Sequence, residues 1–227
     1  MEMMKLIEER HSVRQYKEKN IEDEKRKAIS SEIEKINRET GLHIQVFFDE
    51  EKCFHSIMAH YGKFSGVKNY IALVGNKGTN LDELCGYYGE QLVLLAQSLG
   101  LNTCWVAMTH GKSMAKIDKG EKLVCLIALG YGKTQGVAHT SKPLSELVQE
   151  SSEMTEWFAK GMKAVQLAPT AMNQQKFVFS LNGDEVTMKE SGFSFYTKMD
   201  LGIVKYHFEA VTGKKIHRNQ PEKNGEQ

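Results

Sequence analysis

The segment 80–99 constrains the fold of this chain more than any other segment. Leucine and tyrosine side chains recur there at three- and four-residue steps, which is the spacing of one face of an α-helix. In the second half of the segment, Val93, Leu94 and Ala96 make the helix apolar on nearly every side, and Gly100 ends it. A helix of this kind is stable only when it is buried. We therefore expect it at the centre of the molecule.

Helices and strands are both predicted on either side of this segment. Apolar periodicity predicts a short first helix around Leu6 and further helices over 22–39, 153–167 and 199–212. Alternating apolar residues predict a strand over 43–48, and further strands are predicted over 70–74, 103–108 and 122–129. Asn182-Gly183 predicts a hairpin between 177–181 and 185–188. The polar stretch 133–145 is expected to be a connection.

Composition and charge exclude several classes of function. The 227 residues include 30 basic and 29 acidic side chains, so no global field favours nucleic acid or an anionic membrane. No apolar run approaches the roughly 20 residues of a membrane span, and the charged N-terminus has no apolar signal core. The four cysteines form no CxxC pair and lack histidines at zinc-site spacing. We expect a cytoplasmic protein with reduced thiols, no metal site and no nucleic-acid or membrane partner.

A faint internal repeat predicts two related halves. The helix-then-strand unit of 28–46 is similar to that of 161–179, and the interval from Gly89 to Gly100 equals that from Gly202 to Gly213. Chance similarity between amphipathic elements is the alternative. If the repeat is real, the first half covers 1–135 and a shorter second half covers 136–213, followed by a polar tail at 214–227. A ligand at the seam would contact both halves.

Two polar stretches could hold such a ligand. Arg10 and Arg14, with Ser12 between them, offer two guanidinium groups and a hydroxyl, which suit a phosphate dianion. In the second stretch, 168–175, Pro169 ends a helix, and small or polar residues then lead into a strand. Such a turn can hold a polar ligand edge. The alternatives are a solvated charge cluster for the first stretch and an ordinary helix end for the second.

Four stretches together resemble the FMN-binding nitroreductase family. Arg10–Tyr16 resembles its FMN-phosphate signature, and Ala168–Gln175 resembles its A-P-S-x-x-N-x-Q flavin turn. Leu99–Val106 resembles its L-G-L-x-T-C-W segment, and Leu129–Gly132 resembles the G-Y-x after its last core strand. In ordinary members the flavin turn lies near the N-terminus and reaches the flavin of the partner subunit. Here it lies in the second half, which resembles a branch labelled "putative TM nitroreductase", in which one chain imitates the usual dimer.

The resemblance implies an α+β, nitroreductase-like fold with antiparallel or mixed sheets flanked by helices. It also implies a flavin site between the two halves of one chain, and a monomer rather than an obligate dimer. The implied cofactor-binding residues fall into four groups. They are Arg10, His11, Ser12, Arg14 and Lys133 at the phosphate, Pro169, Thr170, Ala171 and Asn173 at the ring and ribityl chain, Lys63 at the pyrimidine edge, and Val106 and Ala107 near the flavin N5.

Two of these assignments carry a reservation. For Lys63 an ordinary surface lysine is the alternative. Many family members have an acidic residue near the position of Ala107, and this chain has none there. No side chain is implied as a catalytic acid or base.

The implied activity is that of an FMN-dependent oxidoreductase. NADH or NADPH would reduce the bound flavin, which would then reduce a nitro compound, a quinone or a related small-molecule acceptor in ping-pong fashion. The flavin would supply the chemistry, while the protein binds, orients and tunes it. One alternative is a flavin-binding protein for storage or sensing without turnover. Another is an interaction module without flavin.

Overall fold

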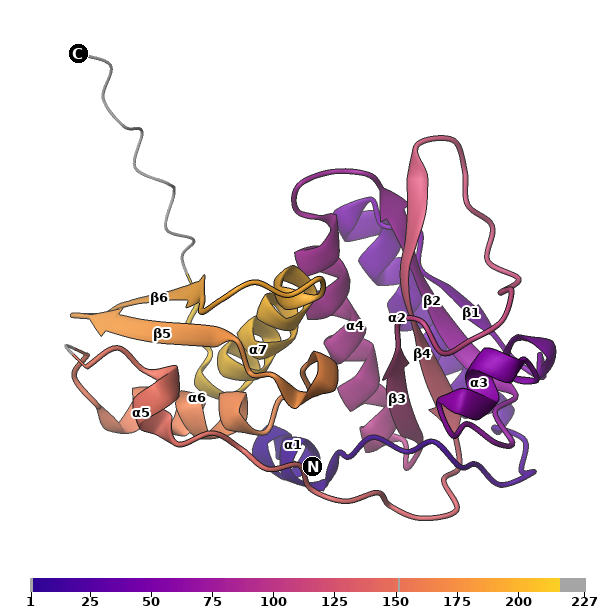
Figure 1. Cartoon of the computed structure of the whole chain (residues 1–227), viewed down its shortest axis with the longest axis horizontal. Coiled ribbons are helices and arrows are strands. Elements are labelled where there is room, and N and C mark those ends of the chain that lie inside the picture. The colour runs from indigo at the N-terminus through magenta and orange to yellow at the C-terminus, as the bar shows by residue number, and fades with distance from the viewer. Residues whose placement is uncertain (1, 151, 217–227) are drawn as a thin grey trace.

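The computed structural model describes residues 2–150 and 152–216. The first part of the chain forms a four-stranded antiparallel sheet in the order β1-β2-β4-β3 (Figure 1). Its strands are β1 (Gln45–Phe47), β2 (Asn69–Asn76), β3 (Asn102–Val106) and β4 (Glu121–Gly130). The continuous apolar run of β2 is buried on both faces, because two helices cover one face of the sheet, and the N-terminal segment with two short helical elements covers the other.

Two helices cover the first face of the sheet. Ile29, Ile33 and Ile36 recur at helical spacing on α2 (Asp23–Thr40), and they share one core cluster with Ile71 of β2. The long helix α4 (Leu81–Ser98) adds Leu92 to the same cluster. Asp23 and Glu24 lie in the first turn of α2, where acidic side chains stabilise the helix N-terminus.

The N-terminal segment covers the second face. After α1 (Met3–Glu9) the chain runs extended across the sheet, and Val13 and Tyr16 enter the core cluster that contains Tyr70 of β2. Two short elements complete this layer, namely the 3-10 helix η1 (Lys52–Phe54) and the helix α3 (Ile57–Tyr61). Phe54 packs edge-on against Phe64 in the same cluster.

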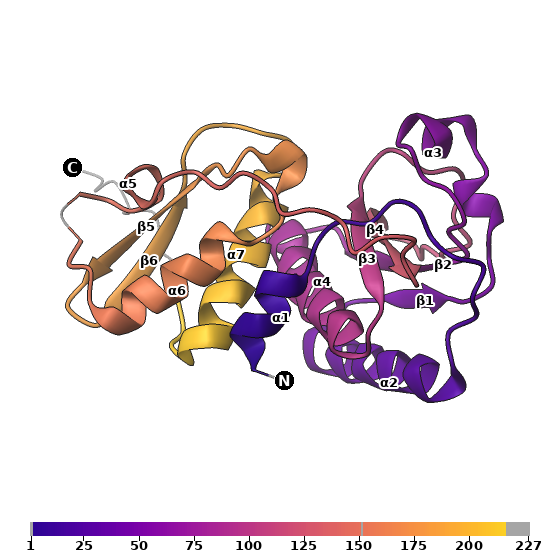
Figure 2. The same ribbon diagram turned by 90° about the horizontal axis from the view of Figure 1, so that it is seen from below.

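The second part of the chain has its own core. It contains α5 (Leu144–Leu147), α6 (Glu156–Gln166), the 3-10 helix η2 (Ala171–Asn173), the hairpin β5 (Phe177–Asn182) and β6 (Glu185–Glu190), and α7 (Thr197–Thr212). Phe158, Phe179 and Phe208 bring α6, β5 and α7 together. Figure 2 shows α7 between α6 and α4, so the central layer consists of one long helix from each part.

The predicted helices and strands are confirmed to within a few residues at their ends, and so is the α+β class. The polar connection is also confirmed, because the chain crosses from the sheet to α5 through 131–143 without regular structure (Figure 2). α5 and η2 are additional short elements. The boundaries of the two halves stay predictions, and most of the expected polar tail lies outside the described residues. No helix in the described ranges is long and apolar enough to cross a membrane.

Candidate functional site

Two backbone hydrogen bonds anchor the N-terminal stretch beside the sheet. The backbone N–H of Val13 donates to the carbonyl of Thr103 on β3 (2.9 Å), and that of Tyr16 donates to Ser65 (2.9 Å). Val13 and Tyr16 are buried, while Ser12 and Arg14 line cavities on the side facing the second part of the chain. Alternation along an extended segment therefore brings the hydroxyl and the guanidinium to one side.

The turn that follows Pro169 has an unusual backbone. Met172, Asn173 and Gln175 adopt φ of 52°, 55° and 47°, the left-handed region that costs energy for residues other than glycine. Gln175 holds this conformation, since its side-chain amide donates to the carbonyl of Thr140 (3.0 Å) and its Oε1 accepts from the backbone N–H of Lys142 (2.9 Å). The turn is therefore fastened to the connection between the two parts of the chain.

Two adjoining cavities lie between the N-terminal stretch and this turn. We call them the arginine cavity and the apolar cavity, with volumes of about 310 and 270 Å³, near the lower end of the usual range of ligand pockets. Both are lined by Ser12, Arg14, Pro169, Thr170 and Met172. The arginine cavity adds Arg10, Val137, Ala138, His139 and Asn173. The apolar cavity adds Cys104, Trp105, Ala107, Met108, Cys125, Ala171, Tyr196, Met199, Asp200 and Ile203.

Arg10 is supported by a buried polar cluster beneath the arginine cavity. Its Nε lies 3.9 Å from Oε1 of Glu90, a fully buried residue of α4. Glu90 Oε2 accepts from the indole N–H of Trp105 (3.0 Å), and Oε1 lies 2.8 Å from Nε2 of His207. Burial lowers the pKa of Arg10, although the nearby carboxylate of Glu90 partly opposes that shift. The cluster therefore fixes a cationic side chain that would be costly to bury alone.

The protonation of His207 follows from its partners. Its Nδ1 lies 2.9 Å from the carbonyl oxygen of Ala164, which can only accept, so Nδ1 carries a hydrogen. One further hydrogen must lie between Nε2 and Glu90 Oε1. These contacts join α4, α6 and α7 at one buried point.

Asp200 brings a carboxyl group into the apolar cavity. It lies in the first turn of α7, is 3% exposed, and accepts a hydrogen bond through Oδ1 from the backbone N–H of Ala171 (3.0 Å). Burial raises the pKa of Asp200 to about 7, against the opposing effect of that hydrogen bond. Desolvation therefore outweighs both the N–H donor and the helix N-terminus, which favour the charged form.

The other titratable groups of this cavity keep their protons near neutral pH. Burial raises the pKa of the Cys104 thiol, and it raises that of the Cys125 thiol to about 12. Burial also raises the pKa of the Tyr196 phenol. The cavity thus combines a fixed positive charge at Arg14 with one carboxyl group that changes charge near neutrality.

The structure brings most of the sequence-predicted binding residues together. Eight of them line the paired cavities, and they are Arg10, Ser12, Arg14, Ala107, Pro169, Thr170, Ala171 and Asn173. Ala107 lines the apolar cavity, while its neighbour Val106 is buried in the core beside it. The Asn173 amide donates to the carbonyl of Thr140 (2.8 Å), so part of its role is to hold the turn.

Besides Val106, three predicted residues do not line either cavity. His11 Nδ1 lies 3.3 Å from the carbonyl of Gln135. Lys133 is exposed, and its backbone N–H donates to Gln15. Lys63 lies in the loop between α3 and β2 with φ of 61°. Their proposed flavin contacts stay predictions that this geometry does not support.

Sequence reasoning missed Asp200, Glu90 and His207. A signal for each was present, because a charged or titratable residue sits next to or near apolar residues in a predicted helix. Asp200 lies between Met199 and Leu201, and Glu90 lies two residues before the apolar run that begins at Leu92. Buried charged side chains of this kind are rare without a partner, so they mark positions to inspect.

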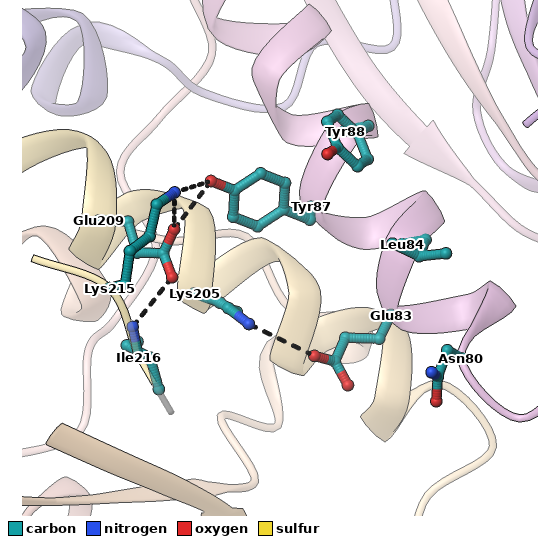
Figure 3. A pocket seen from close by; sticks show the side chains of 9 residues that line it. All are labelled: Asn80, Glu83, Leu84, Tyr87, Tyr88, Lys205, Glu209, Lys215 and Ile216. Atoms are coloured by element: carbon teal, nitrogen blue, oxygen red, sulfur yellow. Dashed lines mark hydrogen bonds and ion pairs between the residues drawn. The ribbon is translucent and has the colours of Figure 1, made fainter. Parts of the chain in front are cut away.

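A separate cavity lies along the contact of α4 and α7 near the end of the described chain (Figure 3). Its four charged side chains form two ion pairs, Lys215 with Glu209 (2.7 Å) and Lys205 with Glu83 (4.0 Å). Glu209 also accepts from the Tyr87 hydroxyl (2.9 Å) and from the backbone N–H of Ile216 (3.0 Å). This arrangement fastens the chain after α7, and no arginine lines the cavity among the described residues.

One further cluster was not expected from the sequence. Ligand atoms of His43, Asp118 and Glu121 lie within 4.8 Å of one another, the only such group found in the described ranges. Glu121 already accepts from the backbone N–H of Asp118 (2.8 Å) and lies 2.9 Å from His43 Nδ1. None of the three lines the paired cavities, and we assign no metal to them.

The fold and the site define an α+β protein in which a cavity lined by two arginines adjoins a largely apolar cavity. The sequence profile of the family described as "Putative TM nitroreductase" matches residues 2–212, and the chain belongs to that family. No curated protein sequence matches the chain.

Solved structures share the fold. A "putative nitroreductase" of Thermotoga maritima is 22% identical, with 93% of this chain and 83% of that chain covered and a TM-score of 0.67. A "putative nitroreductase" of Desulfovibrio desulfuricans, solved in complex with FMN, is 19% identical, with 66% and 97% covered and a TM-score of 0.52. A Bacteroides thetaiotaomicron protein described as "Putative NADH dehydrogenase/NAD(P)H nitroreductase" is also 19% identical, with 65% and 96% covered and a TM-score of 0.52.

Proposed function

We propose that this chain is an FMN-dependent oxidoreductase that uses NADH or NADPH to reduce nitro compounds, quinones or related small acceptors. The observation that carries the proposal is the pairing of the two cavities. A phosphate-bearing aromatic molecule needs cationic and hydroxyl donors at one end and a flat apolar space at the other. The arginine cavity supplies the cationic and hydroxyl donors, and the apolar cavity supplies the space for the ring. The two cavities share five lining residues.

The residues present fit FMN. Arg10 Nε is buried and has no hydrogen-bond partner among the described residues, since the Glu90 carboxylate is 3.9 Å away. An unpartnered buried donor next to a cavity is costly unless a ligand satisfies it. Arg10, Ser12 and Arg14 would hold the phosphate, because charge-assisted hydrogen bonds to phosphate oxygens are strong. The Desulfovibrio protein, which shares the fold and was solved with FMN bound, agrees with this choice.

The ring system would occupy the apolar cavity. When bound, FMN supplies the transfer of hydride between the nicotinamide and the acceptor. Trp105 and Ala107 at the end of β3 would form one wall, and Pro169, Thr170 and Ala171 would form another. Met172, which is 89% exposed, lines both cavities and would shield the ligand from water. Both walls belong to one chain, so the proposed site needs no partner subunit, and we propose a cytoplasmic monomer.

An absorption spectrum of the purified protein tests the proposal. We expect oxidised-flavin bands, either as isolated or after incubation with FMN, that bleach on anaerobic addition of NADH or NADPH. Adding a quinone or a nitroaromatic compound should restore the bands. A flavin that neither nucleotide reduces would indicate storage, sensing or another electron donor. A protein that binds no FMN would refute the assignment.

A further inference from the structure

The carboxyl group of Asp200 is a feature of the apolar cavity to which flavin binding alone gives no role. One oxygen, Oδ1, is engaged by the backbone N–H of Ala171 (3.0 Å). The second oxygen has no hydrogen-bond partner among residues 2–150 and 152–216, and the side chain lines the cavity. A molecule in the cavity is therefore the remaining partner for this oxygen.

The position of Asp200 suits a group that works on a ligand rather than one that holds the fold. A structural carboxylate is normally paired with a cation or with several donors. Asp200 instead lines a cavity that is also lined by Trp105 and Ala107 from the end of β3. Met199 and Ile203 beside it on α7 are apolar, so a planar ligand stacked there would displace water from around the carboxyl group.

The charged and titratable groups that face Asp200 come from several elements. Arg14 comes from the N-terminal stretch, Cys104 from β3, Cys125 from β4 and Tyr196 from the residue before α7. Among the described residues, α4 contributes no side chain to the cavity lining. Burial keeps the two thiols and the phenol protonated, and arginine stays charged. Asp200 is therefore the cavity acid that can release a proton near neutral pH.

On the basis of the proposed function, we propose that Asp200 donates a proton to the oxygen atom of the bound acceptor. The acceptor class that fits is a planar, uncharged aromatic compound whose oxygen gains a proton on reduction, such as a quinone. An acceptor that places a carboxylate next to Asp200 would bring a second carboxyl group into a poorly solvated cavity and would bind less well.

The step balances for a quinone. The quinone receives a hydride, with its two electrons, which originates from NAD(P)H, and that nucleotide is oxidised to NAD(P)⁺. The O–H bond of the Asp200 carboxyl breaks, and an O–H bond forms at the quinone oxygen, so hydroquinone is the product. The Asp200 carboxylate then regains a proton from solvent.

Rapid mixing of the reduced holoprotein with a neutral benzoquinone tests this role. Dithionite reduces the flavin first, so the acceptor step is measured whichever nucleotide is the donor. We expect Asp200→Asn to slow this step by about 100-fold or more, the usual contribution of general acid catalysis. Wild-type rates should fall about tenfold per pH unit above the pKa of Asp200, whereas the rate of Asp200→Asn should not depend on pH there. Asp200→Glu should recover part of the rate.

A second measurement uses no flavin. Carboxyl-carbon NMR of the aspartate-labelled apoprotein should show one resonance that titrates near pH 7, well above ordinary aspartates, and that is missing in Asp200→Asn. Asp184→Asn is the matched control, because Asp184 is exposed and lies outside both cavities.

Two results would overturn the role of Asp200. One is a wild-type acceptor rate and pH profile in Asp200→Asn with FMN bound. The other is an Asp200 resonance that titrates in the ordinary aspartate range. Either result leaves the proposed flavin function standing, whereas a wild-type protein that binds no FMN refutes both proposals together.

Discussion

Gly86 on α4 and Gly202 on α7 contact each other's helices reciprocally. A Cβ atom on Gly86 would lie 2.0 Å from the carbonyl oxygen of Met199, and one on Gly202 would lie 2.0 Å from that of Glu83. Each glycine thus faces the carbonyl three residues before the other glycine. The two helices therefore cross as if a local twofold axis passed between them.

The same relationship connects the two cavities beside this crossing. Gly86 and Gly202 are 116 positions apart (202 minus 86). Four lining residues of the apolar cavity lie in α7 or just before it, and subtracting 116 from their numbers gives four lining residues of the cavity in Figure 3, which lie in α4 or just before it. Tyr196, Met199, Asp200 and Ile203 correspond in this way to Asn80, Glu83, Leu84 and Tyr87. This correspondence supports the predicted duplication, which stays a prediction. The equal intervals Gly89–Gly100 and Gly202–Gly213 in the sequence would pair Gly202 with Gly89. The helix contact in the structure pairs Gly202 with Gly86 instead.

The helix crossing should not tolerate a methyl group. We expect Gly202→Ala to lower the free energy of unfolding by about 1–3 kcal/mol, because overpacking outweighs the better helix propensity of alanine. Lys198→Ala, an exposed change on the same helix, should stay within about 0.5 kcal/mol of wild type. Urea unfolding measures both. In the Gly202→Ala variant the two helices would already be further apart. Adding Gly86→Ala to it should therefore lower the free energy of unfolding by less than Gly86→Ala does in the wild type, and strictly additive losses would contradict this geometry.

Asp200 should make stability depend on pH in an unusual direction. Its pKa is raised to about 7 when folded, from 3.8, so the folded state binds more protons between those values. Stability from this group is therefore full below about pH 4 and is lost as the pH rises to about 7, a total of about 4 kcal/mol as an upper bound. Asp200→Asn should match wild type at low pH and become more stable than wild type at pH 8.

The Asp200 effect is read from the difference between variant and wild type, because other carboxylates titrate in the same range. Urea unfolding at several pH values gives that difference. Glu153→Gln, an exposed change, is the control and should show no trend. A difference between Asp200→Asn and wild type that stays constant from about pH 4 to 8 would show that the group is ionised throughout.

Glycine should relieve strain at Met172. This residue has φ of 52° and is 89% exposed, so Met172→Gly removes a conformational cost without losing core packing. We expect relief of this strain to raise the free energy of unfolding by roughly 0.5–1 kcal/mol. The extra conformational entropy that glycine gives the unfolded chain reduces this gain. Gln174→Gly in the same turn is the control, because φ is −73° there and glycine should destabilise. Equal effects of the two changes would argue against strain at Met172.

Arg14 should distinguish ligands with and without a phosphate. We expect Arg14→Ala to weaken FMN binding roughly 10- to 150-fold, which corresponds to the loss of about 1.5–3 kcal/mol from a charged hydrogen bond. Binding of riboflavin, which has the same ring and no phosphate, should change little. Arg38→Ala removes the same charge from an exposed site on α2 and should leave both affinities unchanged. Fluorescence titration measures them, and equal losses for the two ligands would contradict the phosphate assignment.

The binding stoichiometry should be one FMN per chain. The cavity in Figure 3 corresponds to the apolar cavity by position, but its lysines are already paired with Glu83 and Glu209, and no arginine lines it within the described ranges. A phosphate would have to break one of these pairs. Isothermal titration of the apoprotein should therefore saturate at one equivalent, and Lys205→Ala should leave FMN affinity unchanged. Saturation at two equivalents would show that the second cavity also binds.

Local sequence pattern was sufficient for most of the secondary structure and for one side of the site. The 3.6-residue apolar period of 80–99 and the continuous apolar run of 70–74 determined a buried helix and a buried strand, because burial requires those patterns. Arg10, Ser12 and Arg14 were predictable for a similar reason, since their spacing and chemistry lie within one short stretch.

Only the tertiary structure decided which residues from distant parts of the chain lie close to that stretch. Asp200, Glu90 and His207 lie on two helices far apart in sequence, and their surroundings depend on how α4 and α7 cross at Gly86 and Gly202. That crossing buries one carboxyl beside Arg10 and leaves another facing a cavity. Residue type and spacing determine local conformation, but burial and partners, which set charge and chemistry, exist only once distant segments have packed together.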